Sequence, residues 1–289
     1  MEQLIRTEGL AKRYDGFALE DITLSVPAGT VVGLIGSNGA GKTTTLKAIL
    51  GMIAPDGGTV ELLGHDPHTA SSALAALKQR VGVVLDACPF PVSMKVRDVG
   101  TLGRAAYPRW DAAIFEQLCD QFKLAPKKLV KDLSRGMGMK LSLAFALAHR
   151  PELLVLDEAT AGLDPLARDE VLDLLRRFME QDGHAVLMSS HITTDLEKIA
   201  DQITCIDEGR LMFSMPKDAI CDQAGIARCR TADVEALRDQ GSFDLSGLRA
   251  LHRSMGIDVL VPDRFAFAQA FPALPVDRAS IEDYMTLML

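Results

Sequence analysis

One stretch of the chain combines glycines, a lysine and a threonine at a spacing that can bind phosphate. Residues 36–43 read Gly-Ser-Asn-Gly-Ala-Gly-Lys-Thr and match G-x-x-x-x-G-K-[ST] at every fixed position. Glycines let backbone N–H groups curl around phosphate oxygens, and the start of a following helix adds partial positive charge. Lys42 would bridge the β- and γ-phosphates, and the Thr43 hydroxyl would bind Mg²⁺. The segment predicts a nucleoside triphosphate site.

Both flanks of this segment support the prediction. An apolar run at residues 31–35 enters it, and a helix-forming run at residues 42–50 leaves it before Gly51. The alternative, a glycine-rich turn that binds nothing, does not require this strand-loop-helix context. The residues expected to contact the nucleotide are Gly36, Ser37, Asn38, Gly39, Ala40, Gly41, Lys42, Thr43 and Thr44.

A second chemical feature is the pair of acids that ends the apolar run Leu-Leu-Val-Leu at residues 153–156. Asp157, at the end of a buried strand, could hold the Mg²⁺ shell. Glu158 follows directly, where a carboxylate could polarise the attacking water as general base. Taken alone, the pattern fits a strand that runs into an acidic turn equally well, so the neighbouring motifs have to decide.

Those neighbours resemble the ATP-binding-cassette family. Residues 133–137, Leu-Ser-Arg-Gly-Met, are similar to its Leu-Ser-Gly-Gly-Gln signature, and residues 161–164, Ala-Gly-Leu-Asp, to its D-loop. His191 stands where the family has its switch histidine, and Tyr14 where it has an adenine-stacking aromatic. With the phosphate loop and the acids, these elements follow the family's order from residue 4 to about residue 215.

The resemblance implies an ATPase that uses ATP and Mg²⁺ in a head-to-tail dimer, which we expect to be a homodimer. Each ATP would lie on the phosphate loop of one subunit and against Ser134 and Gly136 of the other subunit. Asp164 of the D-loop is also expected to contact the nucleotide. Lys42, Glu158 and His191 would be the catalytic groups. The stretch at 107–111, Tyr-Pro-Arg-Trp-Asp, together with the signature, resembles a subgroup of bacterial exporters. Their ATPase would lie on the inner face of the membrane, bound to a separate transmembrane permease.

Four positions depart from the family's pattern. Arg135 replaces the first signature glycine, and Met137 replaces the glutamine. Asp86 stands where the Q-loop glutamine is expected, and an aspartate there could still bind the Mg²⁺ shell. Ala159 replaces a proline after the acids. Arg135 could add a charge that faces the opposite ATP or point into solvent, and we expect it to point into solvent. We expect hydrolysis to be retained, with coupling to the membrane partner altered.

The elements that would position these residues alternate along the chain. Short apolar runs at 31–35, 81–85, 153–156, 185–188 and 203–206 predict buried parallel strands with helices between them. Residues 4–10 and 21–26 alternate as half-exposed antiparallel strands do. The fold class is therefore α/β, and the resemblance makes it a P-loop NTPase with a mostly parallel core sheet.

Changes in pattern suggest three parts. Residues 1–217 would form the nucleotide-binding domain, with an antiparallel β subdomain at its start and a helical subdomain at about 88–150. Helices are expected after Asp111, which would cap the first of them, and from residue 137 to residue 149. Residues 218–289 would form a small accessory extension, with a strand at 257–261 and no motif that indicates its role.

Composition limits the remaining function classes. The chain has 289 residues, 48% hydrophobic and 24% charged, with a net charge of −8, which argues against a nucleic-acid partner. Five cysteines without a Cys-x-x-Cys pair favour reduced thiols over disulfides or a metal site. No apolar run approaches the roughly 20 residues of a membrane span. A soluble cassette ATPase outside transport, or an ATP-binding switch that does not hydrolyse, remains the alternative function.

Overall fold

A large mixed sheet forms the centre of the protein. The computed structural model describes residues 2–69, 72–239, 249–254 and 256–289. The strands of the large sheet are β1 (Gln3–Tyr14), β2 (Phe17–Pro27), β3 (Val31–Ile35), β4 (Gly57–Leu62), β5 (Val81–Val84), β6 (Leu153–Asp157), β7 (Ala185–Ser189), β8 (Gln202–Asp207) and β9 (Arg210–Pro216). They lie in the order β4-β1-β2-β9-β8-β3-β7-β6-β5.

The central strands of this sheet are parallel and buried on both faces. β3 pairs in parallel with β7 and β8, and β6 pairs in parallel with β5 and β7. Every residue of β3, β6 and β7 is buried, which is why these strands read as continuous apolar runs. The predicted α/β fold class and the parallel core sheet are confirmed.

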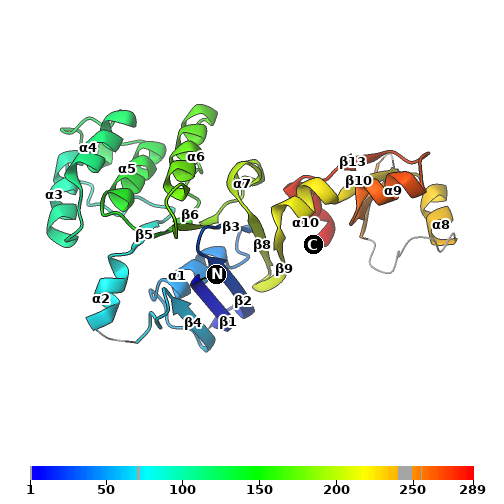
Figure 1. The fold of residues 1–289 in the computed structure, drawn as a ribbon, viewed down its shortest axis with the longest axis horizontal. Helices are drawn as coiled ribbons and strands as arrows, with labels where there is room; N and C mark the ends of the chain where they lie inside the picture. The colour runs from blue at the N-terminus through cyan, green and yellow to red at the C-terminus, as the bar shows by residue number, and fades with distance from the viewer. Residues whose placement is uncertain (1, 70–71, 240–248, 255) are drawn as a thin grey trace.

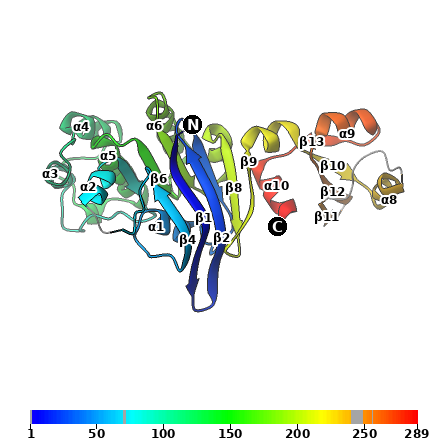
Figure 2. The same ribbon diagram turned by 60° about the horizontal axis from the view of Figure 1, so that its bottom comes forward.

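Antiparallel strands extend the sheet on one side. β1 and β2 form a long hairpin, and β4 pairs with the outer edge of β1 (Figure 2). Their side chains alternate between buried and exposed positions, as the sequence predicted, but the hairpin is longer than the two short runs indicated. β9, which the apolar pattern did not indicate, pairs antiparallel with β8.

Helices cover both faces of the large sheet. They are α1 (Lys42–Ile49), α2 (Ser72–Lys78), α3 (Val96–Ala106), α4 (Ala112–Gln121), α5 (Arg135–Ala148), α6 (Pro165–Met179) and α7 (Thr193–Ile199). One core joins α5, α6 and α7 to one face, and a second core joins α1 to the other face. α3 and α4 pack on α5 rather than directly on the sheet (Figure 1). The Asp111 carboxylate accepts hydrogen bonds from two N–H groups at the start of α4, as its capping role predicted.

A second, smaller sheet lies at the end of the molecule opposite α3 and α4 (Figures 1 and 2). Its elements are β10 (Gly225–Cys229), α8 (Thr231–Asp239), β11 (Ala250–Arg253), β12 (Gly256–Val261), α9 (Arg264–Ala270), β13 (Val276–Arg278) and the final helix α10 (Ile281–Met288). The chain order is βαββαβ and the strand order is β11-β12-β10-β13, all antiparallel. This is the ferredoxin-like arrangement of two interleaved βαβ units.

The final helix joins the small sheet to the large one. Ile281 of α10 belongs to the large core, while Leu287 packs among residues of the small sheet. The Tyr284 ring packs edge-on against the Phe213 ring of β9, with 5.1 Å between the ring centroids. Glu197 of α7 accepts a hydrogen bond of 2.9 Å from the N–H of Ile281. The boundary predicted at residue 217 is therefore bridged by packed side chains, and the division into domains stays a prediction.

Candidate functional site

The site lies where the carboxyl ends of β3, β6 and β7 meet. These three strands are neighbours in the sheet, so the loops that follow them come together at one edge, as in other open α/β sheets. The phosphate loop follows β3, the two acids end β6, and His191 follows β7. A cavity of about 530 Å³ opens between these loops.

The phosphate loop has a conformation that its glycines make possible. Gly36 has φ +149°, and a Cβ atom there would lie 1.9 Å from the carbonyl oxygen of Ile206. Gly41 has φ +112° immediately before α1, so the loop passes directly into the helix start. Lys42 is buried, and its ammonium group donates to the carbonyl oxygens of Gly36 and Ser37 at 2.8 and 3.0 Å. The loop thus holds the lysine beside the space where phosphate would bind.

The acid Asp157 lies at the back of the site and is 1% exposed. One carboxylate oxygen accepts a hydrogen bond from the Thr43 hydroxyl at 2.8 Å, and the other accepts one from the Ser189 hydroxyl at 2.5 Å. Strands β6 and β7 set this contact, because Asp157 and Ser189 face each other in their register. The threonine and the aspartate that were predicted to bind Mg²⁺ are therefore adjacent.

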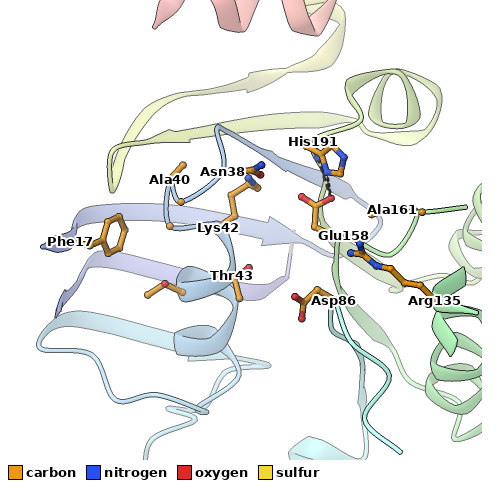
Figure 3. Close-up of a pocket in the computed structure, with 14 residues that line it drawn as sticks. Phe17, Asn38, Ala40, Lys42, Thr43, Asp86, Arg135, Glu158, Ala161 and His191 are labelled. Carbon is orange, nitrogen blue, oxygen red and sulfur yellow. Dashed lines mark hydrogen bonds and ion pairs between the residues drawn. The ribbon is translucent and has the colours of Figure 1, made fainter. Parts of the chain in front are cut away.

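Glu158 and His191 form a pair at the mouth of the cavity. The imidazole Nδ1–H donates to the Glu158 carboxylate at 2.5 Å, and Figure 3 shows both side chains facing each other above Lys42. Glu158 has φ +54°, a left-handed conformation that is unfavourable for a residue with a side chain. Hydrogen bonds from its N–H to the carbonyl and hydroxyl oxygens of Ser189 hold the backbone there. Such strain is concentrated at functional sites.

The oxygen atoms at the back of the site fit a magnesium ion. Mg²⁺ prefers oxygen ligands and is often held by one or two carboxylates together with substrate phosphates and water. Thr43 and Asp157 supply a hydroxyl and a carboxylate, and Asp86 lines the same cavity. Among the described residues there is no cluster of three or more His, Cys, Asp or Glu that would hold a metal alone.

The other predicted contact residues divide into two groups. Asn38, Gly39, Ala40 and Thr44 line the cavity with the residues already described. Ser134 and Asp164 lie outside it and cap helices: Ser134 accepts a hydrogen bond at the start of α5, and Asp164 at the start of α6. Gly136 is buried in the first turn of α5. These three residues are not among those that line the cavity.

Two residues that line the cavity were not predicted from the sequence to do so. Tyr14 is not among the residues that line the cavity, whereas Phe17, its pairing partner across the β1–β2 turn, is. A Cβ at Gly41 would lie 3.0 Å from the Phe17 ring, so this ring lies against the phosphate loop. Arg135, expected to point into solvent, is exposed, and its side chain also lines the cavity beside Gly162. The one sequence signal for the Phe17 contact was that it is a second aromatic residue, three positions after Tyr14.

Comparison with known proteins agrees with this geometry. The family model described as ABC transporter matches residues 19–161. The daunorubicin/doxorubicin resistance ATP-binding protein DrrA of Streptomyces peucetius is 35% identical over 240 residues, covering 80% of this chain and 72% of that protein. The Nod factor export ATP-binding protein I of Burkholderia orbicola (strain AU 1054) is 36% identical over 244 residues, covering 79% and 77% respectively.

A solved structure supports the same assignment. The ATP-binding subunit of an ABC transporter superposes with a TM-score of 0.67 at 27% identity, covering 75% of this chain and 91% of that one. The phosphate loop, Glu158 and His191 line one cavity, and Asp157 contacts Thr43 of that loop. The chain belongs to the ATP-binding proteins of ABC transporters.

Proposed function

We propose that this protein hydrolyses ATP as one half of a head-to-tail homodimer and couples dimer closure to a separate transmembrane subunit of an exporter. The observation that carries the proposal is the Glu158–His191 pair, held at 2.5 Å over the cavity that the phosphate loop lines. The relatives named for drug resistance and for Nod factor export support the exporter assignment.

The chemistry follows from the positions of these groups. Glu158 would accept a proton from the water that attacks the γ-phosphorus, and ADP and phosphate would then leave. His191 would orient the Glu158 carboxylate and contact the γ-phosphate. Lys42, released from the carbonyl oxygens that it now contacts, would offset the charge of the β- and γ-phosphates. Catalysis would be mainly positioning and electrostatic stabilisation.

Magnesium would complete the site. Thr43 and Asp157 would hold it, with Asp86 close to its water shell, and the ion would neutralise charge that develops on the phosphates. The Thr43 hydroxyl donates its proton to Asp157, so the lone pairs of the hydroxyl oxygen stay available for the ion. Asp86 lies two residues after the end of β5 and would also transmit the state of the site towards the membrane partner.

The dimer would place the start of α5 against the partner's nucleotide. Ser134 caps this helix, and the free N–H groups of its first turn are suited to bind phosphate oxygens. Asp164 caps α6 and would lie in the loop between the two nucleotides. The contact with the membrane partner would involve residues 86–96, where the Val92 side chain is 66% exposed.

The membrane partner would also determine where the protein acts. In the part of the chain that the structure describes, no helix is both long enough and apolar enough to cross a bilayer. We propose a peripheral position on the inner face of the membrane, with the permease supplying the route for cargo.

Light scattering on Glu158→Gln protein tests the proposal. With ATP and Mg²⁺ we expect the monomer to become a dimer, because a nucleotide that is bound and not hydrolysed keeps the two subunits closed. Adding Ser134→Arg should abolish dimer formation, since a bulky side chain would occupy the phosphate contact at the start of α5. A protein that binds no ATP would contradict the proposal. ATP binding without a dimer would contradict the homodimer.

A second prediction concerns the adenine ring. We expect Phe17→Ala to weaken ATP binding by about tenfold, because stacking on an aromatic ring contributes roughly 1–3 kcal/mol per base. Tyr14→Ala should have a smaller effect, because Tyr14 is 48% exposed and lies outside the cavity. Isothermal titration of ATP into each variant measures the difference. A larger loss for Tyr14→Ala would return the adenine contact to the residue that the sequence indicated.

A further inference from the structure

Arg135 occupies an unusual position in the site. It is the first residue of α5, between the helix cap Ser134 and the buried Gly136. Its side chain passes over the D-loop, where a Cβ at Gly162 would lie 3.5 Å from the Arg135 Cδ. Figure 3 shows the side chain directed from α5 towards Glu158, and it lines the same cavity as Lys42. A residue of the signature thus reaches the nucleotide cavity of its own subunit.

The guanidinium group of Arg135 is available for a ligand. Within the described residues it takes part in no hydrogen bond or ion pair, whereas Lys42 is bound to carbonyl oxygens of its own loop. The nearby Glu158 carboxylate is engaged with His191. Arginine presents a planar set of N–H donors that matches the geometry of phosphate oxygens. Lys42 therefore lies on the phosphate-loop side of the cavity, and Arg135 lies on the D-loop side with its guanidinium group free to bind a ligand.

We propose that Arg135 binds the terminal phosphate of the ATP held by its own subunit, and so makes the single subunit prefer ATP to ADP before two subunits meet. The inference rests on the proposed function and adds a contact within one subunit to those expected from the partner's Ser134 and Gly136. ADP lacks the terminal phosphate, so it would gain nothing from the guanidinium group. The preference would select ATP-loaded subunits for dimer closure.

The test compares nucleotide affinities of the monomer. ATP with Mg²⁺ and ADP with Mg²⁺ are titrated calorimetrically at a concentration where light scattering shows a monomer with nucleotide bound. We expect Arg135→Gln to weaken ATP binding by about tenfold and to leave ADP binding unchanged, because a hydrogen bond to a charged group is lost with only one of the two ligands. Arg135→Lys should fall between, since it keeps the charge without the planar fork.

Matched variants separate this inference from other causes. Arg177→Gln removes an exposed arginine from the last turn of α6, away from the cavity, and should change neither affinity. Unchanged ATP affinity in monomeric Arg135→Gln would overturn the inference, and so would a defect that appears only after dimer formation. Either result leaves the proposed function standing if the unmodified protein binds ATP. Failure of the unmodified protein to bind ATP would instead refute the proposed function itself.

Discussion

Replacing Glu158 by glutamine is expected to slow ATP turnover by about 10²- to 10⁴-fold, the usual range for removal of a general base. The amide keeps the shape of the side chain but cannot accept a proton from water. ATP should still bind, because Lys42 and the loop N–H groups that would hold the phosphates are untouched. Steady-state phosphate release measures turnover, and calorimetric titration of ATP measures binding.

The control for this variant is Glu61→Gln, which removes an exposed carboxylate from the outer strand β4. Its turnover should equal that of the unmodified protein. Turnover in Glu158→Gln that matches the control would show that another group accepts the proton. The backbone of Glu158 is strained at φ +54°. Loss of ATP binding in Glu158→Gln would show that the carboxylate supports the shape of this loop rather than proton transfer from water.

Gly36→Ala is expected to cause the largest loss of stability of any single change in the phosphate loop. The new Cβ would lie 1.9 Å from the carbonyl oxygen of Ile206, and both atoms are attached directly to backbone that cannot move without disturbing β3 or β8. We expect the free energy of unfolding to fall by about 3 kcal/mol or more, since overpacking and an unfavourable φ act together. Urea unfolding measures this loss.

Gly39→Ala provides the matched comparison. Gly39 also has a positive φ, +83°, but a Cβ there would meet no atom within 4 Å. Its cost should be only that of the left-handed conformation, about 1–2 kcal/mol. Equal losses for the two variants would show that backbone conformation alone, and not the contact with Ile206, makes glycine necessary at position 36.

The buried strands could be predicted from sequence because each is apolar on both faces. The run at 31–35 became β3 with the same bounds, and 153–156 became β6 with Asp157 added. β9 could not be predicted in this way, because only Phe213 is buried among residues that alternate between exposed and partly buried positions, and because its place depends on pairing with β8. β13 has three residues, too few for a periodic pattern.

The site was predictable in part. The phosphate-loop motif predicted Lys42 and Thr43, and the resemblance to the cassette family predicted the roles of Asp157 and His191. The structure brings these residues together because β3, β7 and β6 are neighbours in the sheet. Phe17 could not, because its contact with the phosphate loop depends on where the β1–β2 hairpin ends. The direction of Arg135 depends on how α5 packs beside Gly162, which no local pattern contains.

The position of α10 has a consequence for how the chain folds during synthesis. Ile281 completes a core that otherwise consists of residues before 222, and Tyr284 covers Phe213 of β9. Because the ribosome releases the chain from its N-terminal end, this apolar surface beside α7 stays uncovered until residues 281–288 have emerged. The nucleotide site can therefore bind ATP before synthesis ends, whereas the core beside α7 is complete only after α10 has been made. A premature stop between β9 and α10 would leave the nucleotide-binding motifs intact. The apolar surface that α10 covers would then stay exposed and favour aggregation.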